Sequence, residues 1–598
     1  MLFKKKTRHI TITLIALHSL IPITLIHAQS KQTSTATETV NIQILGINDF
    51  HGQISTGRFV DKEPVGSAAV LAAYLKQAQT GMEDRTLITI MGDQVGASSP
   101  ASGLLYDEPS ILFINSLGNN HCRTEARMDP LCNIVATLGN HEFDKGQKAL
   151  FDLIYGRDTP PTDSWIPLAH YPGAAYPYIS TNIIDTETEK LLFPPYTIKL
   201  VHDIPVAFIG AILKNAADLM SPTNTQGIKF LDEAETINHY IPEIKAKGVN
   251  IIIVLLHEGG NQTSYDGNTQ IDTQVEGSIK TIVQQLNDDV DVVMCGHTHQ
   301  FLNAFLPNHN GKEILVTQAN SYSTAFADVM LEVDVKNHQI IHKSARIVTT
   351  YANRWPGTMP DKQTQELIAL AESKVEPIIN QHVGTTENAL LRTPNDDGES
   401  NLGNLIADAF KTAMDTDIGL TNPHGIRDDI SAGPITWGTL YSVLPFSNHI
   451  VSVALTGEDI YELLEQQWRG SYSNMLQISG ITYIYDLQQP LGQRVVVVYH
   501  QGTPLIKEKT YTIATTDFLA SGNGIFSVLK KAKLIKIGET DHATVLQYIK
   551  QLPQPFAVSI EGRIKKRDAL KKYSDSLTSS LNKPTPSKEQ TSKEQKSE

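Results

Sequence analysis

The sequence predicts an α/β domain with layered sheets, followed by a smaller α+β domain. Its length of 598 residues suggests at least two domains. Between residues 41 and 348, short apolar runs alternate with amphipathic stretches, which is typical of α/β proteins. The turn-rich segment "YANRWPGTMPDKQ" then marks a boundary, after which helical and strand-like patterns continue to residue 561.

Six apolar runs of the first domain read as strands: "NIQILGIN", "RTLITIM", "CNIVATLGN", "IPVAFIGAIL", "VNIIIVLLH" and "VDVVMCGH". Helical patterns such as "GSAAVLAAYLKQAQ" and "DEAETINHYIPEIKAKG" lie between several of them. Buried strands that alternate with helices predict layered sheets.

The segment "TQELIALAESKVEPIINQ" predicts a linker helix at residues 361–380, and the second domain then covers residues 382–561. In this domain, Thr456 stands three residues before Asp459 in a helix-start pattern. The runs "RVVVVYH" and "KTYTIATTDF" predict strands. The segment "SNLGNLIADAFKTAM" predicts a helix whose apolar face holds Leu402, Leu405, Ile406, Ala409, Phe410 and Ala413.

The two ends of the chain differ from its centre. Residues 1–28 have a basic start, an apolar run that contains Pro22, and Ala28, which is the layout of a secretory signal peptide; an uncleaved anchor is the alternative. We therefore expect export to the periplasm, the cell surface or the medium. No later run is long enough to span a bilayer. Residues 563–598 are polar and predict a disordered tail, with wall or partner binding as the alternative.

Composition and cysteine content narrow the class of protein further. Hydrophobic residues make up 40% and charged residues 19%, as in folded globular proteins. The net charge of -14 argues against a nucleic-acid polymer or an anionic membrane as a partner. In an exported protein, Cys122 and Cys132 could close a polar loop by a disulfide, whereas Cys295 reads as a small core residue.

Polar residues of metal-binding types follow the strand-like runs of the first domain. Because the loops beyond the carboxyl ends of strands form the binding crevice of α/β sheets, these residues can converge. Carboxylate, amide and imidazole ligands suit divalent ions of intermediate hardness, and a pair of ions about 3.5–4 Å apart serves phosphoryl hydrolysis. Each motif alone is more often a turn, but five of them together favour a metal site. The residues are Asp49, His51, Asp93, Asn140, His141, Asp144, His257, His297 and His299.

The ordered set "D-x-H … GD … GNHE … H … GHTH" resembles the calcineurin-like metallophosphoesterase superfamily. Downstream, "ESNLGNLIADAF", "NPHGIR" and "VLPFSN" resemble the C-terminal domain of 5'-nucleotidases, a family that includes UDP-sugar hydrolases and 2',3'-cyclic nucleotide phosphodiesterases. The resemblance covers residues 41 to 561. It implies a four-layer sandwich for residues 41–348, in which two packed mixed sheets are flanked by helices.

The resemblance also implies a role for each of these candidate metal-site residues. Asp49, His51, Asp93 and His299 would hold one ion, and Asp93, Asn140, His257 and His297 the other, with Asp93 bridging. The ions could be manganese, zinc, cobalt or magnesium. His141 would not be a ligand: it would stabilise the phosphoryl transition state or the leaving oxygen, and Asp144 would orient it.

The second domain would select the substrate. By resemblance, Arg427 contacts phosphate, Phe446 and Phe518 sandwich a base, and Asn422 and Asn448 bond base edges. For either phenylalanine, core packing is the alternative. Several positions depart from the family pattern: Pro423 and His424 replace glycines, "SGNGIF" lacks the aspartate that bonds the ribose, and Asn320 and Ser323 stand near the substrate entrance.

The resemblance therefore predicts an exported 5'-nucleotidase with two divalent ions. It would hydrolyse nucleoside monophosphates to nucleoside and phosphate by in-line attack of water held by the ions. A phosphodiester or pyrophosphate hydrolase of the same family, acting on a 2',3'-cyclic nucleotide, a UDP-sugar or NAD, is one alternative. A non-catalytic surface-binding protein is another. The exact substrate and the oligomeric state stay open.

Overall fold

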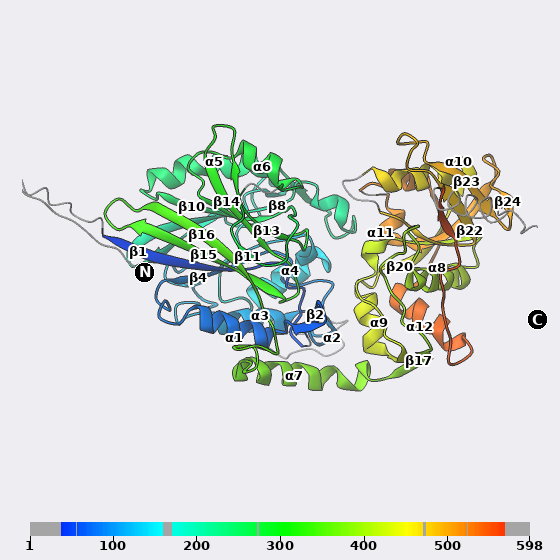
Figure 1. The fold of residues 1–598 in the computed structure, drawn as a ribbon, viewed down its shortest axis with the longest axis horizontal. Helices are drawn as coiled ribbons and strands as arrows, with labels where there is room; N and C mark the ends of the chain where they lie inside the picture. Colours follow the sequence, from blue (N-terminus) through cyan, green and yellow to red (C-terminus); the bar gives the residue numbers. More distant parts are fainter. Residues whose placement is uncertain are drawn as a thin grey trace, which may run out of the picture. The chain divides into compact units, whose positions relative to one another are not determined.

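Two six-stranded mixed sheets form the body of the first domain (Figure 1). In the first sheet, β1, β4 and β5 run parallel, and β15 and β16 continue antiparallel from β1. Its strands, in spatial order, are β11 (Gly267–Asn268), β16 (Gln339–Thr349), β15 (Ala325–Asp334), β1 (Thr39–Ile47), β4 (Thr86–Met91) and β5 (Ile134–Thr137).

In the second sheet, β14, β12, β10 and β8 are parallel, and an antiparallel strand closes each edge. Its strands are β13 (Phe301–Pro307), β14 (Glu313–Ala319), β12 (Val292–Cys295), β10 (Ile251–His257), β8 (Ile204–Ile212) and β7 (Tyr196–Val201). The apolar runs of the sequence predict the strands β1, β4, β5, β8, β10 and β12. The hairpins β13–β14 and β15–β16 are not among the predicted elements.

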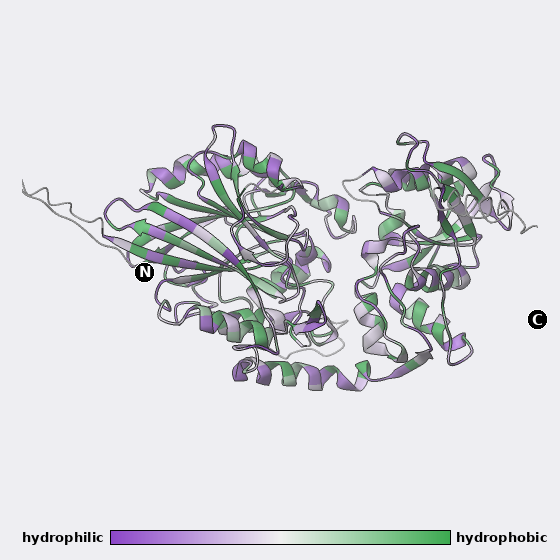
Figure 2. Ribbon diagram, viewed as in Figure 1, coloured by the Kyte–Doolittle hydropathy of each residue, from purple (hydrophilic) through white to green (hydrophobic). Residues whose placement is uncertain are grey.

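Helices cover the outer face of each sheet, so the domain has the four layers that the resemblance implied. Helices α1 (Ala68–Ala78), α3 (Glu108–Leu117) and α4 (Gly146–Tyr155) pack on the first sheet. Helices α5 (Glu233–Ala246) and α6 (Ile279–Gln285) pack on the second. Between the sheets lies a dry core of aliphatic side chains from both, and Figure 2 shows these strands as predominantly hydrophobic.

The first domain also contains shorter elements. They are β2 (Arg58–Val60), β3 (Glu63–Val65), α2 (Pro100–Gly103), η1 (His141–Phe143), β6 (Ile183–Asp185), η2 (Ala216–Leu219) and β9 (Ile228–Phe230). The computed structural model describes residues 38–55, 57–158, 170–271, 274–469, 474–522 and 524–567. The predicted signal peptide, residues 568–598 of the predicted tail, and Asn523 of the segment "SGNGIF" lie outside these residues. No helix in these ranges is long and apolar enough to cross a membrane.

Helix α7 (Lys362–Ile379) follows the sandwich, close to the predicted limits of the linker helix. Its start is fixed by Asp361, whose side chain accepts a hydrogen bond from the N–H of Thr364. Its apolar face packs Ile368, Ala371 and Val375 into the core of the first domain. Figure 2 shows the alternation of polar and apolar residues along this helix.

The C-terminal domain combines helices with a five-stranded and a four-stranded sheet. The larger sheet consists of β21 (Gln477–Ser479), β18 (Ile418–Thr421), β25 (Thr510–Thr516), β20 (His449–Thr456) and β26 (Lys533–Thr540). The smaller consists of β24 (Thr503–Pro504), β23 (Val495–His500), β22 (Ile481–Tyr485) and β27 (Ile564–Lys566). The remaining elements are β17 (His382–Thr386), η3 (Pro423–Gly425), β19 (Gly433–Thr436), α9 (Trp437–Val443), α10 (Gly457–Glu465), η4 (Gln466–Trp468), α11 (Asp517–Ala520), η5 (Ser527–Lys531) and α12 (Asp541–Gln551).

Helix α8 (Asn401–Met414) carries the apolar face that the sequence predicts, with one difference at its end. Ala413 is exposed, and Met414 is buried in its place. Met414 packs in the buried cluster that also holds Phe410 and Ile450, and the helix ends after it at the left-handed residue Asp415. Helix α10 begins with the predicted cap, in which Thr456 and Asp459 bond each other's backbone N–H groups.

Candidate functional site

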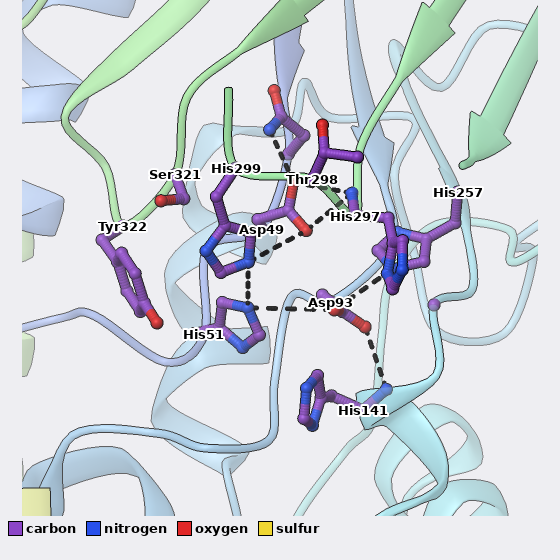
Figure 3. Close-up of polar contacts among 12 residues, drawn as sticks. Asp49, His51, Asp93, His141, His257, His297, Thr298, His299, Ser321 and Tyr322 are labelled. Carbon is purple, nitrogen blue, oxygen red and sulfur yellow. Dashed lines mark hydrogen bonds and ion pairs between the residues drawn. The ribbon is translucent and has the colours of Figure 1, made fainter. Parts of the chain in front are cut away.

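The predicted metal ligands meet where the parallel strands of both sheets end (Figure 3). Asp49 and His51 follow β1, Asp93 follows β4 and Asn140 follows β5 in the first sheet. His257 is the last residue of β10, and His297 and His299 follow β12, in the second. Because the carboxyl ends of parallel strands share one edge of a sheet, residues far apart in the sequence come together.

These side chains form two clusters that share Asp93. The ligand atoms of Asp49, His51, Asp93 and His299 lie within 4.8 Å of one another, and so do those of Asp93, His257 and His297. The Nε2 atoms of His51 and His299 are 3.0 Å apart, and Nε2 of His257 is 3.1 Å from Oδ2 of Asp93. The first group has the members that the family resemblance implied, and the second has three of its four expected members, without Asn140; Asp93 is common to both.

Carbonyl groups fix the ring orientation of two of the histidines. Nδ1 of His51 lies 2.8 Å from the carbonyl oxygen of Gly96, and Nδ1 of His257 lies 2.7 Å from that of Met91. A carbonyl can only accept, so Nδ1 carries a hydrogen in both rings and Nε2 of each ring faces the cluster. This is the tautomer that binds a metal ion through Nε2. Burial opposes protonation of His257, but the carboxylate of Asp93 outweighs it and raises the pKa of this ring to about 10, so a cation at Nε2 would replace a proton there.

The donor set fits divalent cations. Oδ1 of Asn140 is buried and has no hydrogen-bond partner in the part of the chain that the structure describes. Burial lowers the pKa of His297 to about 3, and burial likewise holds the pKa of His51 well below its usual range, so both rings are neutral ligands. Two carboxylates, an amide oxygen and imidazoles match ions of intermediate hardness.

The backbone at these ligands is unusual. Asp49, His51, Asp93, His297 and His299 have φ angles of 49°, 49°, 48°, 77° and 58°. Residues with a Cβ atom seldom occupy this left-handed region, and where they do the conformation is held by the surrounding structure. Hydrogen bonds supply that restraint: the N–H of His297 donates to Oδ1 of Asp49 at 2.9 Å, and Nδ2 of Asn48 donates to Oδ2 of Asp49 at 2.7 Å.

Glu142 ties together two of the ligand-bearing loops, a role that the sequence analysis missed. Its Oε2 accepts hydrogen bonds from the N–H groups of Asp93 and Gly139, at 2.9 and 2.6 Å, and its Oε1 accepts one from Gln94 at 2.8 Å. The side chain is 4% exposed. One carboxylate therefore fixes the loop of Asp93 against the loop of Asn140. In the sequence, only the glutamate of the motif "GNHE" pointed to this role.

His141 and Asp144 form the pair that the resemblance implied. Nδ1 of His141 lies 2.8 Å from Oδ2 of Asp144, and the N–H of His141 donates to Oδ1 of Asp93 at 2.9 Å. Burial opposes protonation of the ring, but the carboxylates of Asp144 and Asp93 outweigh it and raise the pKa of His141. The ring stands 5.1 Å from that of His51, so an imidazolium would border the cluster without belonging to it.

Two of the predicted substrate residues reach this centre from the C-terminal domain. The ring of Phe446 stacks on that of His141, with centroids 5.7 Å apart and an interplanar angle of 20°. Nη2 of Arg427 donates to the hydroxyl of Tyr322 at 2.8 Å, and its guanidinium lies 5.7 Å from the Phe446 ring. The ring of Tyr322, which the sequence analysis did not identify, is 5.1 Å from His51 and 5.2 Å from His299 (Figure 3).

The other three predicted substrate residues have the following surroundings. Phe518 lies half-buried in α11. Nδ2 of Asn448 donates to Oδ2 of Asp541 at 3.3 Å, so this amide faces the start of α12. Asn422 precedes the short helix η3 and makes no side-chain hydrogen bond there.

Comparisons with known proteins agree with this architecture. Residues 42–301 match the family described as calcineurin-like phosphoesterase, and residues 382–531 match the 5'-nucleotidase C-terminal domain. The chain is 32% identical to the cell wall protein Lmo0130 of Listeria monocytogenes, over 92% of this chain and 71% of that protein. It is also 32% identical to endonuclease YhcR of Bacillus subtilis over 90% of this chain, but spans only 42% of that protein.

A solved structure shows the same arrangement of domains. The 5'-nucleotidase precursor of Thermus thermophilus superposes with a TM-score of 0.71 and 26% identity, covering 88% of this chain and 99% of that one. The similarity extends across both the sandwich and the C-terminal domain.

Proposed function

Because this chain belongs to the 5'-nucleotidase family, in which a metallophosphoesterase domain precedes a 5'-nucleotidase C-terminal domain, we propose that it hydrolyses nucleoside 5'-monophosphates to nucleoside and phosphate. The chain is a hydrolase of the metallophosphoesterase type. One observation supports the nucleotide substrate most directly: Phe446 and Arg427 of the C-terminal domain meet His141 and Tyr322 at the metal clusters.

The residues of the two clusters would hold two divalent ions. Asp93 would be a ligand of both ions, and Asn140 would be a further ligand of the ion in the second cluster. Such ions supply an acidified water and neutralise charge on the phosphoryl oxygens. His141 then has a separate task. Its raised pKa favours the imidazolium, which donates a hydrogen bond to the leaving oxygen, and Asp144 holds the ring in that orientation.

The C-terminal residues would recognise the rest of the substrate. Arg427 presents a planar guanidinium that suits a phosphate. Phe446 offers a half-buried ring beside the reacting centre, and a nucleobase can stack on it with little discrimination between bases. This arrangement supports several nucleoside monophosphates as substrates in place of a single one.

A phosphodiester substrate, including a nucleic acid, is the second candidate. The observation that favours it is the 32% identity over 90% of this chain to a protein named as an endonuclease. The net charge of -14 opposes extensive contact with a polynucleotide, because phosphates attract basic surfaces. A short or single-stranded diester, bound chiefly at the metal clusters, meets this objection.

Export is part of the proposal. The structure contains a disulfide between Cys122 and Cys132, and such bonds persist in oxidising compartments. The relative from Listeria is named as a cell wall protein. These two facts, with the predicted signal peptide at residues 1–28, support a location outside the cytoplasm.

We also propose that residues 41–348 and 382–561 are the two functional domains.

The test is phosphate release by the purified chain after chelation and after return of manganese, zinc, cobalt or magnesium. The substrates are AMP, GMP, UMP, 2',3'-cyclic AMP, UDP-glucose, NAD and a single-stranded oligonucleotide, with a coupled phosphatase to reveal diester and pyrophosphate products. We expect direct, metal-dependent release from the monophosphates. Activity confined to the diesters would establish the second candidate.

Variants connect the activity to the site. Asp93→Asn should abolish turnover and reduce the bound metal. Asp328→Asn is the matched control, because Asp328 is also a largely buried aspartate of the first sheet but bonds Gln43, outside both clusters. Equal activity of the two variants would contradict the proposed metal site.

A further inference from the structure

A buried side chain of a neighbouring strand anchors the turn that carries His297 and His299. Gln318, in β14, is fully buried, and its Nε2 donates hydrogen bonds to Oγ1 of Thr298 and to the carbonyl oxygen of Gln300, both at 2.7 Å. Because a carbonyl group can only accept, the amide nitrogen must face this turn. Gln318 therefore holds the residue between the two histidines and the residue just after them.

Thr298 connects this anchor to the loop that follows His257. Its hydroxyl donates to the carbonyl oxygen of Gly260 at 2.8 Å and accepts the hydrogen bond from Gln318. The same loop approaches Gln318 closely: a Cβ atom on Gly259 would lie 1.9 Å from Oε1 of Gln318, so this position of the segment "HEGG" has no room for a side chain. The loops after β10 and β12 are therefore both packed against one amide.

The side chain of Thr298 restrains the backbone of its two neighbours. His297 and His299 have φ angles of 77° and 58°, a region that residues with a Cβ atom occupy only where the surrounding structure holds them. Figure 3 shows the hydroxyl of Thr298 directed away from Asp93, toward which the two rings lie. The ring of His299 belongs to the first cluster and that of His297 to the second. The anchored Thr298 thus fixes the separation of the two rings.

We propose that Gln318 is a positioning residue for both metal ions: through Thr298, it directs one imidazole of the turn to each cluster. This inference rests on the two ions of the proposed function, and it involves no contact with the substrate. Side chains that orient metal ligands in this way change metal affinity about 10- to 100-fold when they are replaced. Because one amide restrains both histidines, its loss weakens the binding of both ions together.

The test is a binding measurement that needs no turnover. The purified, metal-free chain is titrated with Co²⁺, and binding is followed by visible absorption, which also reports the geometry of the ligands. Gln318→Leu keeps a side chain of similar size but removes both donors. We expect this variant to bind each of the two ions about tenfold more weakly than the wild type, with a changed absorption spectrum.

Gln43→Leu is the matched control for a merely structural effect. Gln43 is also a buried glutamine of a sheet, and its Nε2 donates to the carbonyl oxygen of Ala78 at 3.2 Å and to Oδ1 of Asp328 at 2.9 Å, outside both clusters. Both variants should lower the free energy of unfolding in urea, because each leaves buried polar groups without partners. Only Gln318→Leu should lower the affinity for Co²⁺.

Variants of Thr298 decide whether Gln318 acts through the turn. Thr298→Val removes the hydroxyl and should weaken both ions about tenfold, whereas Thr298→Ser keeps the hydroxyl and should bind as the wild type does. In the double variant Gln318→Leu/Thr298→Val, the loss should stay near tenfold, because both changes break the same hydrogen bond. A loss of about a hundredfold, the product of two independent effects, overturns the proposal.

Three other results of the titration overturn the proposal: unchanged binding by Gln318→Leu, a loss confined to one ion, or an equal loss in Gln43→Leu. If Gln318→Leu does not fold, the Thr298 variants decide, and equal binding by Thr298→Val and Thr298→Ser overturns the proposal. Turnover of AMP separates this inference from the proposed function. A wild type that binds two ions but hydrolyses no nucleotide refutes the function, while the titration still decides the role of Gln318.

Discussion

Replacing Glu142 with glutamine tests whether one buried carboxylate organises the metal site. The substitution keeps the size of the side chain but exchanges one oxygen for an NH₂ group. All three hydrogen bonds of Glu142 come from backbone N–H groups, those of Asp93, Gln94 and Gly139. In the best orientation of the amide, its oxygen accepts from the N–H groups of Asp93 and Gly139. Its NH₂ group then points at the N–H of Gln94, so that two donors face each other.

The magnitude follows from these three bonds. A buried N–H left without an acceptor costs about 1–3 kcal/mol. The two remaining bonds change from charge-assisted to neutral, which removes about half of the strength of each. We therefore expect the free energy of unfolding to fall by about 2–5 kcal/mol. Because the loop of Asp93 would lose its fixed position, metal affinity should fall about 10- to 100-fold, as for other residues that orient ligands.

Two measurements check this, namely urea unfolding and the metal content after dialysis against buffered free zinc or manganese. Glu258→Gln is the control: Glu258 is also a buried glutamate next to a ligand, His257, but it accepts one hydrogen bond, from the adjacent N–H of Gly259 at 2.9 Å. Glu142→Gln should lose metal and stability, and Glu258→Gln far less. Similar behaviour of the two variants would refute the role assigned to Glu142.

Three further predictions follow from the same structure. Burial raises the pKa of Asp541 to about 7, so between about pH 4 and 7 the folded state binds a proton that the unfolded state has released. The free energy of unfolding should therefore fall by on the order of a few kcal/mol as the pH rises from about 4 to 7. In urea titrations at several pH values, Asp541→Asn should lack most of this slope. Cys122→Ser opens the loop to Cys132 and should lower stability by about 2–4 kcal/mol, a difference from wild type that a reductant erases. Asp144→Asn should lower the pKa of His141 and reduce kcat about 10- to 100-fold at unchanged metal content; loss of metal would instead make Asp144 part of the ion-binding structure.

The sandwich was predictable because its parallel strands are buried on both faces. Such strands are continuous apolar runs, and the residues after them must lie at one edge of the sheet. The antiparallel strands β15 and β16 were harder to recognise, since β16 alternates between buried and exposed residues along a partly solvated strand. The sequence therefore predicted which polar residues would lie together at the strand ends, whereas it did not predict the sheet edges.

Residues that act through tertiary contacts left no sequence signal. Gln318 lies in β14, and only the fold brings its amide to Thr298. At Asn448, for which the resemblance implied a base contact, the amide donates to Asp541 at the start of α12. A motif identifies a position, while the direction of a side chain depends on partners that lie far away in the sequence.

The left-handed backbone at five candidate metal ligands would link metal supply to the survival of the protein. Each such residue raises the energy of the fold by roughly 1 kcal/mol, and the negative charges of Asp49 and Asp93 add repulsion when no cation is present. Ions that bind only the folded state offset this strain by mass action. Without available metal the chain would therefore unfold more often and be cleared faster by proteases, so its abundance would report on available metal.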